Sequence, residues 1–125
     1  MEEASSLFER FLRTYPEGSP IFEEGAAGYE MFIVHSGKVK LLKKSKGGED
    51  KTLTVLGPGE FFGEMSLIDG SPRSTSAVAG EEGAGLIVLD MAKFMYLIQQ
   101  HPMFSYTIMG KLSQRLREAN VSIIG

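Results

Sequence analysis

Cysteine is absent from the 125 residues of this chain, and histidine is nearly so. Without cysteine there are no disulfides and no thiolate metal ligands, and the composition suits a reducing cytoplasm. The two histidines, His35 and His101, are too far apart in sequence to indicate a clustered metal site. We therefore expect no metal, a cytoplasmic location, and a single domain, residues 1–125, that folds around its own hydrophobic core.

Blocks of one charge sign and long apolar runs are missing as well. Thirteen basic and sixteen acidic residues give a net charge of −3, and apolar residues interrupt the densest lysine stretch, residues 38–46. Nucleic-acid-binding domains concentrate positive charge on one face, so DNA binding by this chain alone is not expected. The longest apolar runs, residues 31–34 and 86–89, are far shorter than the roughly 20 residues of a membrane span. We expect no membrane association and no signal peptide.

The sequence also lacks the common enzyme motifs. Its glycines at positions 57, 59 and 63 are spaced one residue too widely for a dinucleotide-binding fingerprint. No Gly-x-Ser-x-Gly elbow and no phosphate-loop Gly-Lys-Ser/Thr occurs. We therefore expect no enzyme activity, no catalytic residues and no cofactor.

Glycine, in contrast, is abundant and unevenly distributed. Thirteen of the fifteen glycines lie between residues 18 and 85, and none lies between Leu86 and Met109. In residues 18–89 these glycines separate short, strand-like segments: residues 20–22, 29–34, 38–43, 52–56, 74–79 and 86–89, with a turn at 35–37. This spacing predicts a mainly β fold, an antiparallel β-roll or jelly roll (a double-stranded β-helix), rather than a parallel sheet.

Helices are expected on both sides of the roll. Residues 5–15, within an N-terminal segment 1–17, carry apolar residues at helical spacing, and Pro16 would end that helix. Two C-terminal helices are predicted in residues 90–125, the first over 91–100 and the second from Pro102 to about residue 121.

The last helix carries a short apolar seam with the alternating spacing of a coiled coil, made of Met109, Leu112, Leu116, Ala119 and Ile123. Such a seam packs either on the chain's own roll or on a second copy. We expect Phe104, Ile108 and Met109 to pack on the roll. From Leu112 onward the seam predicts a homodimer, with residues 109–123 as the interface.

Residues 57–75 stand apart because they combine a flexible turn with polar side chains. Gly63 permits a tight turn that brings the backbone close to a ligand. Residues 64–68 can form one helical turn whose free N–H groups would attract an anion. Arg73 offers a planar fork for a phosphate, and Ser74 and Thr75 add hydroxyl groups.

Glu64 does not suit a phosphate site by itself, because two negative charges repel each other. It would need a hydroxyl partner of its own. A ligand that carries both a phosphate and a sugar hydroxyl satisfies Glu64 and Arg73 together, which indicates a nucleotide. The alternative is that the two residues form only a surface ion pair.

The sequence Phe-Gly-Glu-Met-Ser-Leu at residues 62–67, followed by Pro-Arg-Ser at 72–74, resembles the phosphate-binding cassette of a known family. That family is the cyclic-nucleotide-binding domain, of the catabolite activator protein and protein kinase A regulatory subunit type. The resemblance extends over nearly the whole chain and places the cassette at residues 61–75. Thr75 departs from the pattern, because the family usually has alanine there.

The resemblance implies a role for each matching residue. Glu64 would accept a hydrogen bond from the ribose 2′-hydroxyl, and Arg73 would pair with the exocyclic oxygens of the cyclic phosphate. Backbone N–H groups and a hydroxyl, from Gly63, Met65, Ser66 and Ser74, would complete the phosphate site. The base would be lined by Leu41 and Thr54, with Phe61, Ala119 and Asn120 as further candidates.

The function that follows from the resemblance is a non-catalytic sensor that binds cAMP rather than cGMP and signals to an unidentified effector protein through its last helix. The alternative is a family member that has lost nucleotide binding and serves as a dimerisation or protein-interaction module.

Overall fold

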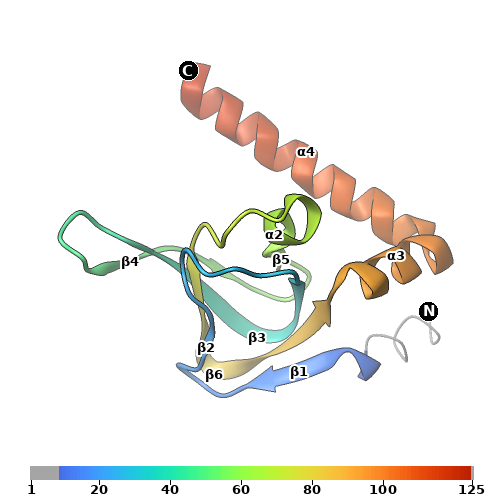
Figure 1. Cartoon of the computed structure of the whole chain (residues 1–125), viewed down its shortest axis with the longest axis horizontal. Helices are drawn as coiled ribbons and strands as arrows, with labels where there is room; N and C mark the ends of the chain where they lie inside the picture. Colours follow the sequence, from blue (N-terminus) through green and yellow to red (C-terminus); the bar gives the residue numbers. More distant parts are fainter. Residues whose placement is uncertain (1–8, 125) are drawn as a thin grey trace. The chain divides into compact units, whose positions relative to one another are not determined.

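A computed structural model describes residues 9–124 of the chain, and the side chains of residues 9–119. It divides the chain into two compact units, Met1–Met91 and Ala92–Gly125. The strands lie in the first unit and the long C-terminal helix in the second (Figure 1). The elements of the first unit are β1 (Leu12–Tyr15), β2 (Pro20–Phe22), β3 (Met31–Lys44), β4 (Asp50–Leu56), β5 (Phe61–Phe62), α2 (Glu64–Asp69) and β6 (Ser76–Leu89).

The six strands form one antiparallel sheet. The order along its main path is β1-β6-β3-β4, with β2 paired to β6 and β5 paired to β3. Every one of these pairings is antiparallel. The predicted antiparallel, mainly β architecture is therefore confirmed.

The two longest strands, β3 and β6, replace four shorter ones that the glycine spacing predicted. Residues 35–37 do not form a turn, because β3 continues through them beside β6 with register shifts on both sides of the segment. Gly37 lies at this irregular part of the strand and has a φ of 75°, which other residues rarely adopt. A Cβ there would lie 2.1 Å from the carbonyl oxygen of Gly83. The glycines of these strands thus mark bulges and close backbone approach instead of strand ends.

Strand β6 likewise continues from Ser76 to Leu89 without the expected break. At the predicted break the chain bends, because Glu82 has a φ of 68° and Gly83 a φ of 80°. Pairing with β3 on both sides of this bend keeps the two halves in one strand.

The predicted N-terminal helix is wrong for its second half. Residues 9 and 10 are helical, but Leu12–Tyr15 is strand β1, paired with β6 from Leu12↔Ile87 to Tyr15↔Ala84. Backbone pairing with an edge of the sheet outweighs the local helical pattern, and Thr14 and Tyr15 favour strands in any case. The part of the prediction on residues 5–8 lies outside the described residues.

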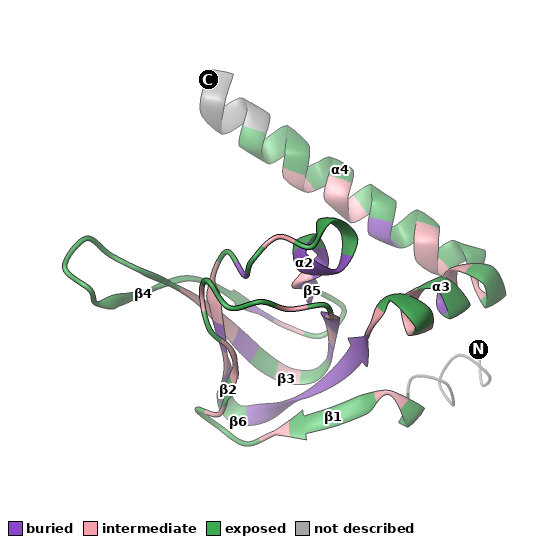
Figure 2. Cartoon of the chain, viewed as in Figure 1, coloured by how far each residue is buried: buried purple, intermediate pink, exposed green. Residues whose placement is uncertain are grey.

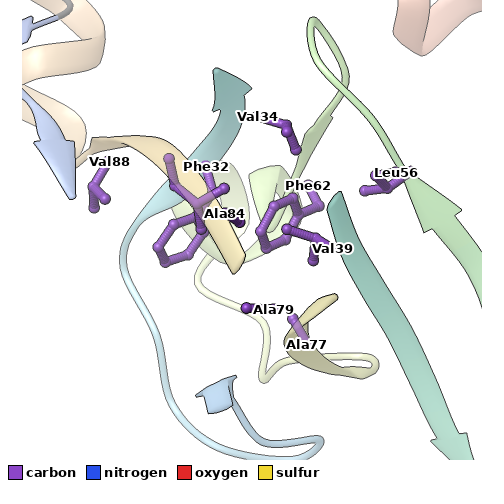
Figure 3. Packing of buried hydrophobic residues seen from close by; sticks show 10 residues of the cluster. Phe32, Val34, Val39, Leu56, Phe62, Ala77, Ala79, Ala84 and Val88 are labelled. Atoms are coloured by element: carbon purple, nitrogen blue, oxygen red, sulfur yellow. The ribbon is translucent and has the colours of Figure 1, made fainter. Parts of the chain in front are cut away.

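The core of the first unit is formed mainly by side chains of β3 and β6. Figure 2 shows buried residues concentrated on β6 and β3, while β4 is exposed along most of its length. Close up, Phe32 and Phe62 lie at the centre of the cluster (Figure 3), and their rings stack with centroids 5.1 Å apart. The cluster consists of Phe32, Val34, Val39, Leu56, Phe62, Ala77, Ala79, Ala84, Leu86 and Val88.

The second unit holds the two predicted C-terminal helices. Helix α3 spans Met91–Gln100 and begins at the last residue of the first unit, and α4 spans Pro102–Ile124. Phe94 and Phe104 join the two helices, with ring centroids 6.0 Å apart in an edge-to-face arrangement. Ile108 is buried, Phe104 half-buried and Met109 57% exposed, and the packing of these side chains on the roll stays a prediction.

Glu24 ties three strands together just beyond the end of β2. Its backbone N–H donates to the Ser76 hydroxyl (2.9 Å), at the start of β6. One carboxylate oxygen accepts a hydrogen bond from the Lys44 amide (3.0 Å), and the other lies 3.6 Å from the Lys43 ammonium group. The Lys44 amide, and then the charge of Lys43, lower the pKa of Glu24 below its ordinary value.

We expect Glu24→Gln to lower the melting temperature at neutral pH. A carboxylate whose pKa is lowered on folding stabilises the folded state above its unfolded pKa and loses that effect as pH falls through its folded pKa. The difference in melting temperature between the wild type and the variant should therefore shrink as pH falls through the acidic range, as followed by circular dichroism. Glu23→Gln is the matched control at an exposed neighbour. A difference that does not change with pH contradicts the assignment.

Candidate functional site

The segment that follows β5 has the local structure that its sequence predicted. Gly63 begins the turn in the left-handed region, with a φ of 79°, and α2 starts at the next residue. Gly70, with a φ of 73°, ends the helix, and its N–H donates to the carbonyl oxygen of Ser66 (3.1 Å). Two glycines in a conformation that other residues rarely adopt thus confine α2 to six residues, as the helical-turn prediction requires.

Polar burial in the described part of the chain is confined to this cassette. Three polar or charged residues are classed as buried there: Glu64 is 9% exposed, Ser66 3% and Arg73 5%. Buried polar groups cost free energy unless they have partners, so folded chains keep few of them. All three belong to the residues predicted to bind the ligand.

Arg73 is held by backbone and by aromatic rings. Its Nη1 donates to the carbonyl oxygens of Glu30 (2.8 Å) and Gly63 (3.1 Å). Its guanidinium carbon lies 4.3 Å from the centroid of the Phe22 ring and 5.6 Å from that of Phe32. Nε is buried and has no hydrogen-bond partner in the described structure.

The charge of Arg73 is therefore poorly compensated. Burial lowers the pKa of the guanidinium, and the nearby charge of Glu30 acts in the opposite direction. The Glu30 carboxylate itself pairs with Arg13, at 3.9 Å between Nη2 and Oε2. Glu64 and Arg73 are 9% and 5% exposed, so the alternative of an ion pair on the surface does not describe their position. Arginine stays protonated even when buried, so the group keeps its positive charge in this environment.

A cleft of about 430 Å³ reaches Arg73 from the side of β1 and β2. Arg13, Phe22, Gly28 and Glu30 are among the residues that line it. Of the predicted site residues only Arg73 does so, and Glu64 and Ser74 lie outside this lining.

The other cassette residues are placed differently. Met65 is 55% exposed, so only its backbone is suited to the predicted role. Ser74 is exposed and Thr75 half-buried. The Ser74 carbonyl oxygen accepts a hydrogen bond from the Lys43 ammonium group (3.0 Å), which ties the end of the cassette to β3.

The residues predicted to line the base differ in how far they are buried. Leu41 is half-buried and packs against the core cluster, opposite Thr54 in the register of β3 and β4. Thr54 is exposed, but it pairs directly with Leu41, and residues that lie opposite each other in an antiparallel pair carry their side chains on the same face of the sheet. Phe61 is 1% exposed and belongs to the interior.

The remaining two candidates lie in the second unit. Ala119 is exposed on α4, and Asn120 lies on the same helix with a side chain outside the described residues. Their contact with a base stays a prediction.

Phe22 and Glu30 are functional candidates that the sequence analysis missed. Both contact Arg73, yet they lie about 40 to 50 residues before it in the chain. No local pattern marks such a contact, because an apolar residue in a strand and a backbone carbonyl carry no motif.

The described part of the chain offers neither a metal site nor a membrane-spanning helix. No group of three or more His, Cys, Asp or Glu residues there could hold a metal ion. None of the helices in residues 9–124 is long and apolar enough to cross a membrane.

Comparison with known proteins gives consistent matches. The family model of the cyclic nucleotide-binding domain matches residues 12–101. The cyclic AMP receptor protein of Thermus thermophilus is 44% identical over 120 residues, which cover 96% of this chain and 54% of that protein. The crystal structure of the Thermus thermophilus catabolite activator protein is similar with a TM-score of 0.84 and 42% identity, over 98% of this chain and 57% of that one.

A third match comes from a study of a cyclic-GMP-dependent signalling pathway that regulates bacterial phytopathogenesis. That structure is 33% identical, with a TM-score of 0.71, and the match covers 94% of each chain. The chain spans about half the length of the first curated relatives that it matches. These matches confirm the predicted β-roll, and the family model covers well over half of the sequence. The chain belongs to the cyclic nucleotide-binding domain family.

Proposed function

We propose that this chain is a non-catalytic sensor domain that binds a cyclic nucleotide, with cAMP preferred over cGMP. One observation carries the proposal: Arg73 is 5% exposed, and its buried Nε has no hydrogen-bond partner in the described structure. A buried charge without compensation costs several kcal/mol, and an anionic ligand would remove that cost. The cyclic phosphate supplies such an anion.

Other residues of the cassette and of the roll would bind the ribose, the remaining phosphate oxygens and the base. Glu64 would accept a hydrogen bond from the ribose 2′-hydroxyl, and the backbone N–H groups of Gly63, Met65 and Ser66 would donate to the phosphate. Ser74 and Thr75 would add hydroxyl donors at the end of the cassette. On this proposal Leu41 lines the base of the nucleotide. The further candidates for contact with the base are Phe61, Thr54, Ala119 and Asn120.

The preference for cAMP rests on the relatives. The Thermus thermophilus relative at 44% identity is a cyclic AMP receptor protein, whereas the match from the cyclic-GMP-dependent pathway is 33% identical.

Signalling requires that the ligand favour one arrangement of the chain over another. We propose that binding draws the cassette inward and shifts α4, which passes the change to an effector protein. The exposed seam of α4 supports a homodimer: Met109 is 57% and Leu116 65% exposed. Apolar side chains in such a stripe gain free energy when a second helix covers them.

We expect Arg73→Ala to weaken cyclic nucleotide binding by about 10- to 150-fold, because a hydrogen bond to a charged group contributes about 1.5–3 kcal/mol. Isothermal titration calorimetry with cAMP and with cGMP measures the loss and the preference together. Arg10→Ala, at an exposed arginine, is the matched control and should bind like the wild type. Absence of heat and of any thermal shift with the wild type at millimolar ligand would replace this function by that of an interaction module.

The role of Glu64 predicts a specific discrimination against a modified ligand. We expect 2′-deoxy-cAMP to bind the wild type more weakly than cAMP, because the carboxylate then loses its hydroxyl partner. Glu64→Gln, which keeps the size but removes the charge, should narrow the difference between the two ligands. Equal affinity of the wild type for both ligands would remove Glu64 from the site.

The dimer predicts that Leu116→Asp yields monomers, because a charge in an apolar helical seam is left without a partner. Sedimentation velocity measures the mass directly. Ser113→Asp places the same charge on an exposed position outside the seam and should leave the dimer intact. An unchanged mass for Leu116→Asp contradicts the seam as the interface.

A further inference from the structure

Gly28, in the loop before β3, lies directly against the guanidinium of Arg73. A Cβ built on Gly28 would lie 2.3 Å from Nε and 2.5 Å from both Cζ and Nη2. These are the three nearest atoms, and the anchored Nη1 is not among them. Any other residue at this position would displace the group.

The backbone conformation of Gly28 does not itself require glycine. Its φ lies outside the positive range, unlike that of Gly63, where a φ of 79° restricts the choice of residue. A Cβ on Gly63 would also approach Nη1 to 2.8 Å. Both glycines therefore border the guanidinium, and at Gly28 the three atoms that a Cβ would approach most closely all belong to Arg73.

Phe22 covers one face of the same group. Its ring centroid lies 4.3 Å from the guanidinium carbon, a distance at which the cation interacts favourably with the face of an aromatic ring. The ring is itself held in place, because it packs against Phe32 at 5.7 Å and Phe62 at 5.8 Å between centroids. The guanidinium thus rests on a rigid aromatic support.

We infer that Gly28 and Phe22 are positioning residues that hold the Arg73 guanidinium ready for the phosphate of the ligand. The inference rests on the proposed function for its ligand, but the contact with Arg73 is testable without any ligand. A guanidinium that is already oriented loses less conformational freedom when it binds an anion. A substitution that displaces the Arg73 guanidinium should therefore lower the affinity for the ligand.

The first test is Gly28→Ala, with affinity for cAMP measured by calorimetry. We expect a loss of about tenfold or more, comparable with the loss of one charged hydrogen bond. Gly47→Ala is the matched control, because its φ is also ordinary and the nearest atom to a Cβ there is 4.0 Å away. Unchanged or higher affinity in Gly28→Ala overturns the positioning role.

The second test is a double-mutant cycle on thermal stability without ligand. In the wild-type background Gly28→Ala should lower the melting temperature, because the displaced guanidinium gives up its carbonyl partners. In an Arg73→Ala background the same change should be neutral or stabilising, because the clash is gone and alanine restricts the unfolded chain. An equal effect in both backgrounds overturns the contact. If the wild type binds no nucleotide, the proposed function fails, whereas this cycle still decides the contact.

The role of Phe22 is tested by comparing two substitutions in the same titration. Phe22→Leu removes the ring but keeps an apolar side chain, and it should weaken cAMP binding by a few-fold. Phe22→Tyr retains the ring and should bind like the wild type. Equal affinities of the two variants contradict an aromatic support.

Discussion

The buried guanidinium of Arg73 is the charge on which the arrangement of the cassette depends. Taking a charge out of water costs several kcal/mol unless hydrogen bonds and nearby charges offset the loss. Two backbone carbonyls accept from Nη1 and the ring of Phe22 covers one face, while Nε keeps no partner in the described structure. The offset is therefore incomplete at Nε, and on the proposed function the cyclic phosphate would complete it.

This single group joins segments that are far apart in the chain. Phe22 ends β2, Glu30 precedes β3, and Gly63 begins the turn into α2, yet all three contact Arg73. On the proposed function, an anion bound to Arg73 would change the charge beside all three segments at once. On the proposed function, a ligand bound at this side chain would therefore act on several segments of the first unit together, as a sensor domain requires.

Local signals in the sequence predicted the elements whose cause is local. The glycines around α2 and the apolar spacing of α3 determine those helices within a few residues, so both were found. Strand β1 was not, because its structure comes from pairing with Ile87 and Ala84, more than 60 residues later. Arg73 and Glu64 could be recognised from their motif. Phe22 and Gly28 could not, because their contact with Arg73 exists only after β2, β3 and the cassette have come together.

The most direct test of the role of Arg73 follows the NMR signal of its Nε–H group during a titration with cAMP. The signal is assigned by its absence from the spectrum of Arg73→Ala. Without ligand the buried Nε–H should give a resolved signal that exchanges slowly with water, since the group is shielded from solvent. Binding of the phosphate should shift this signal strongly, with the same saturation as the calorimetric titration. Saturation of the protein with ligand while the Arg73 signal stays unchanged would contradict the central role of this arginine.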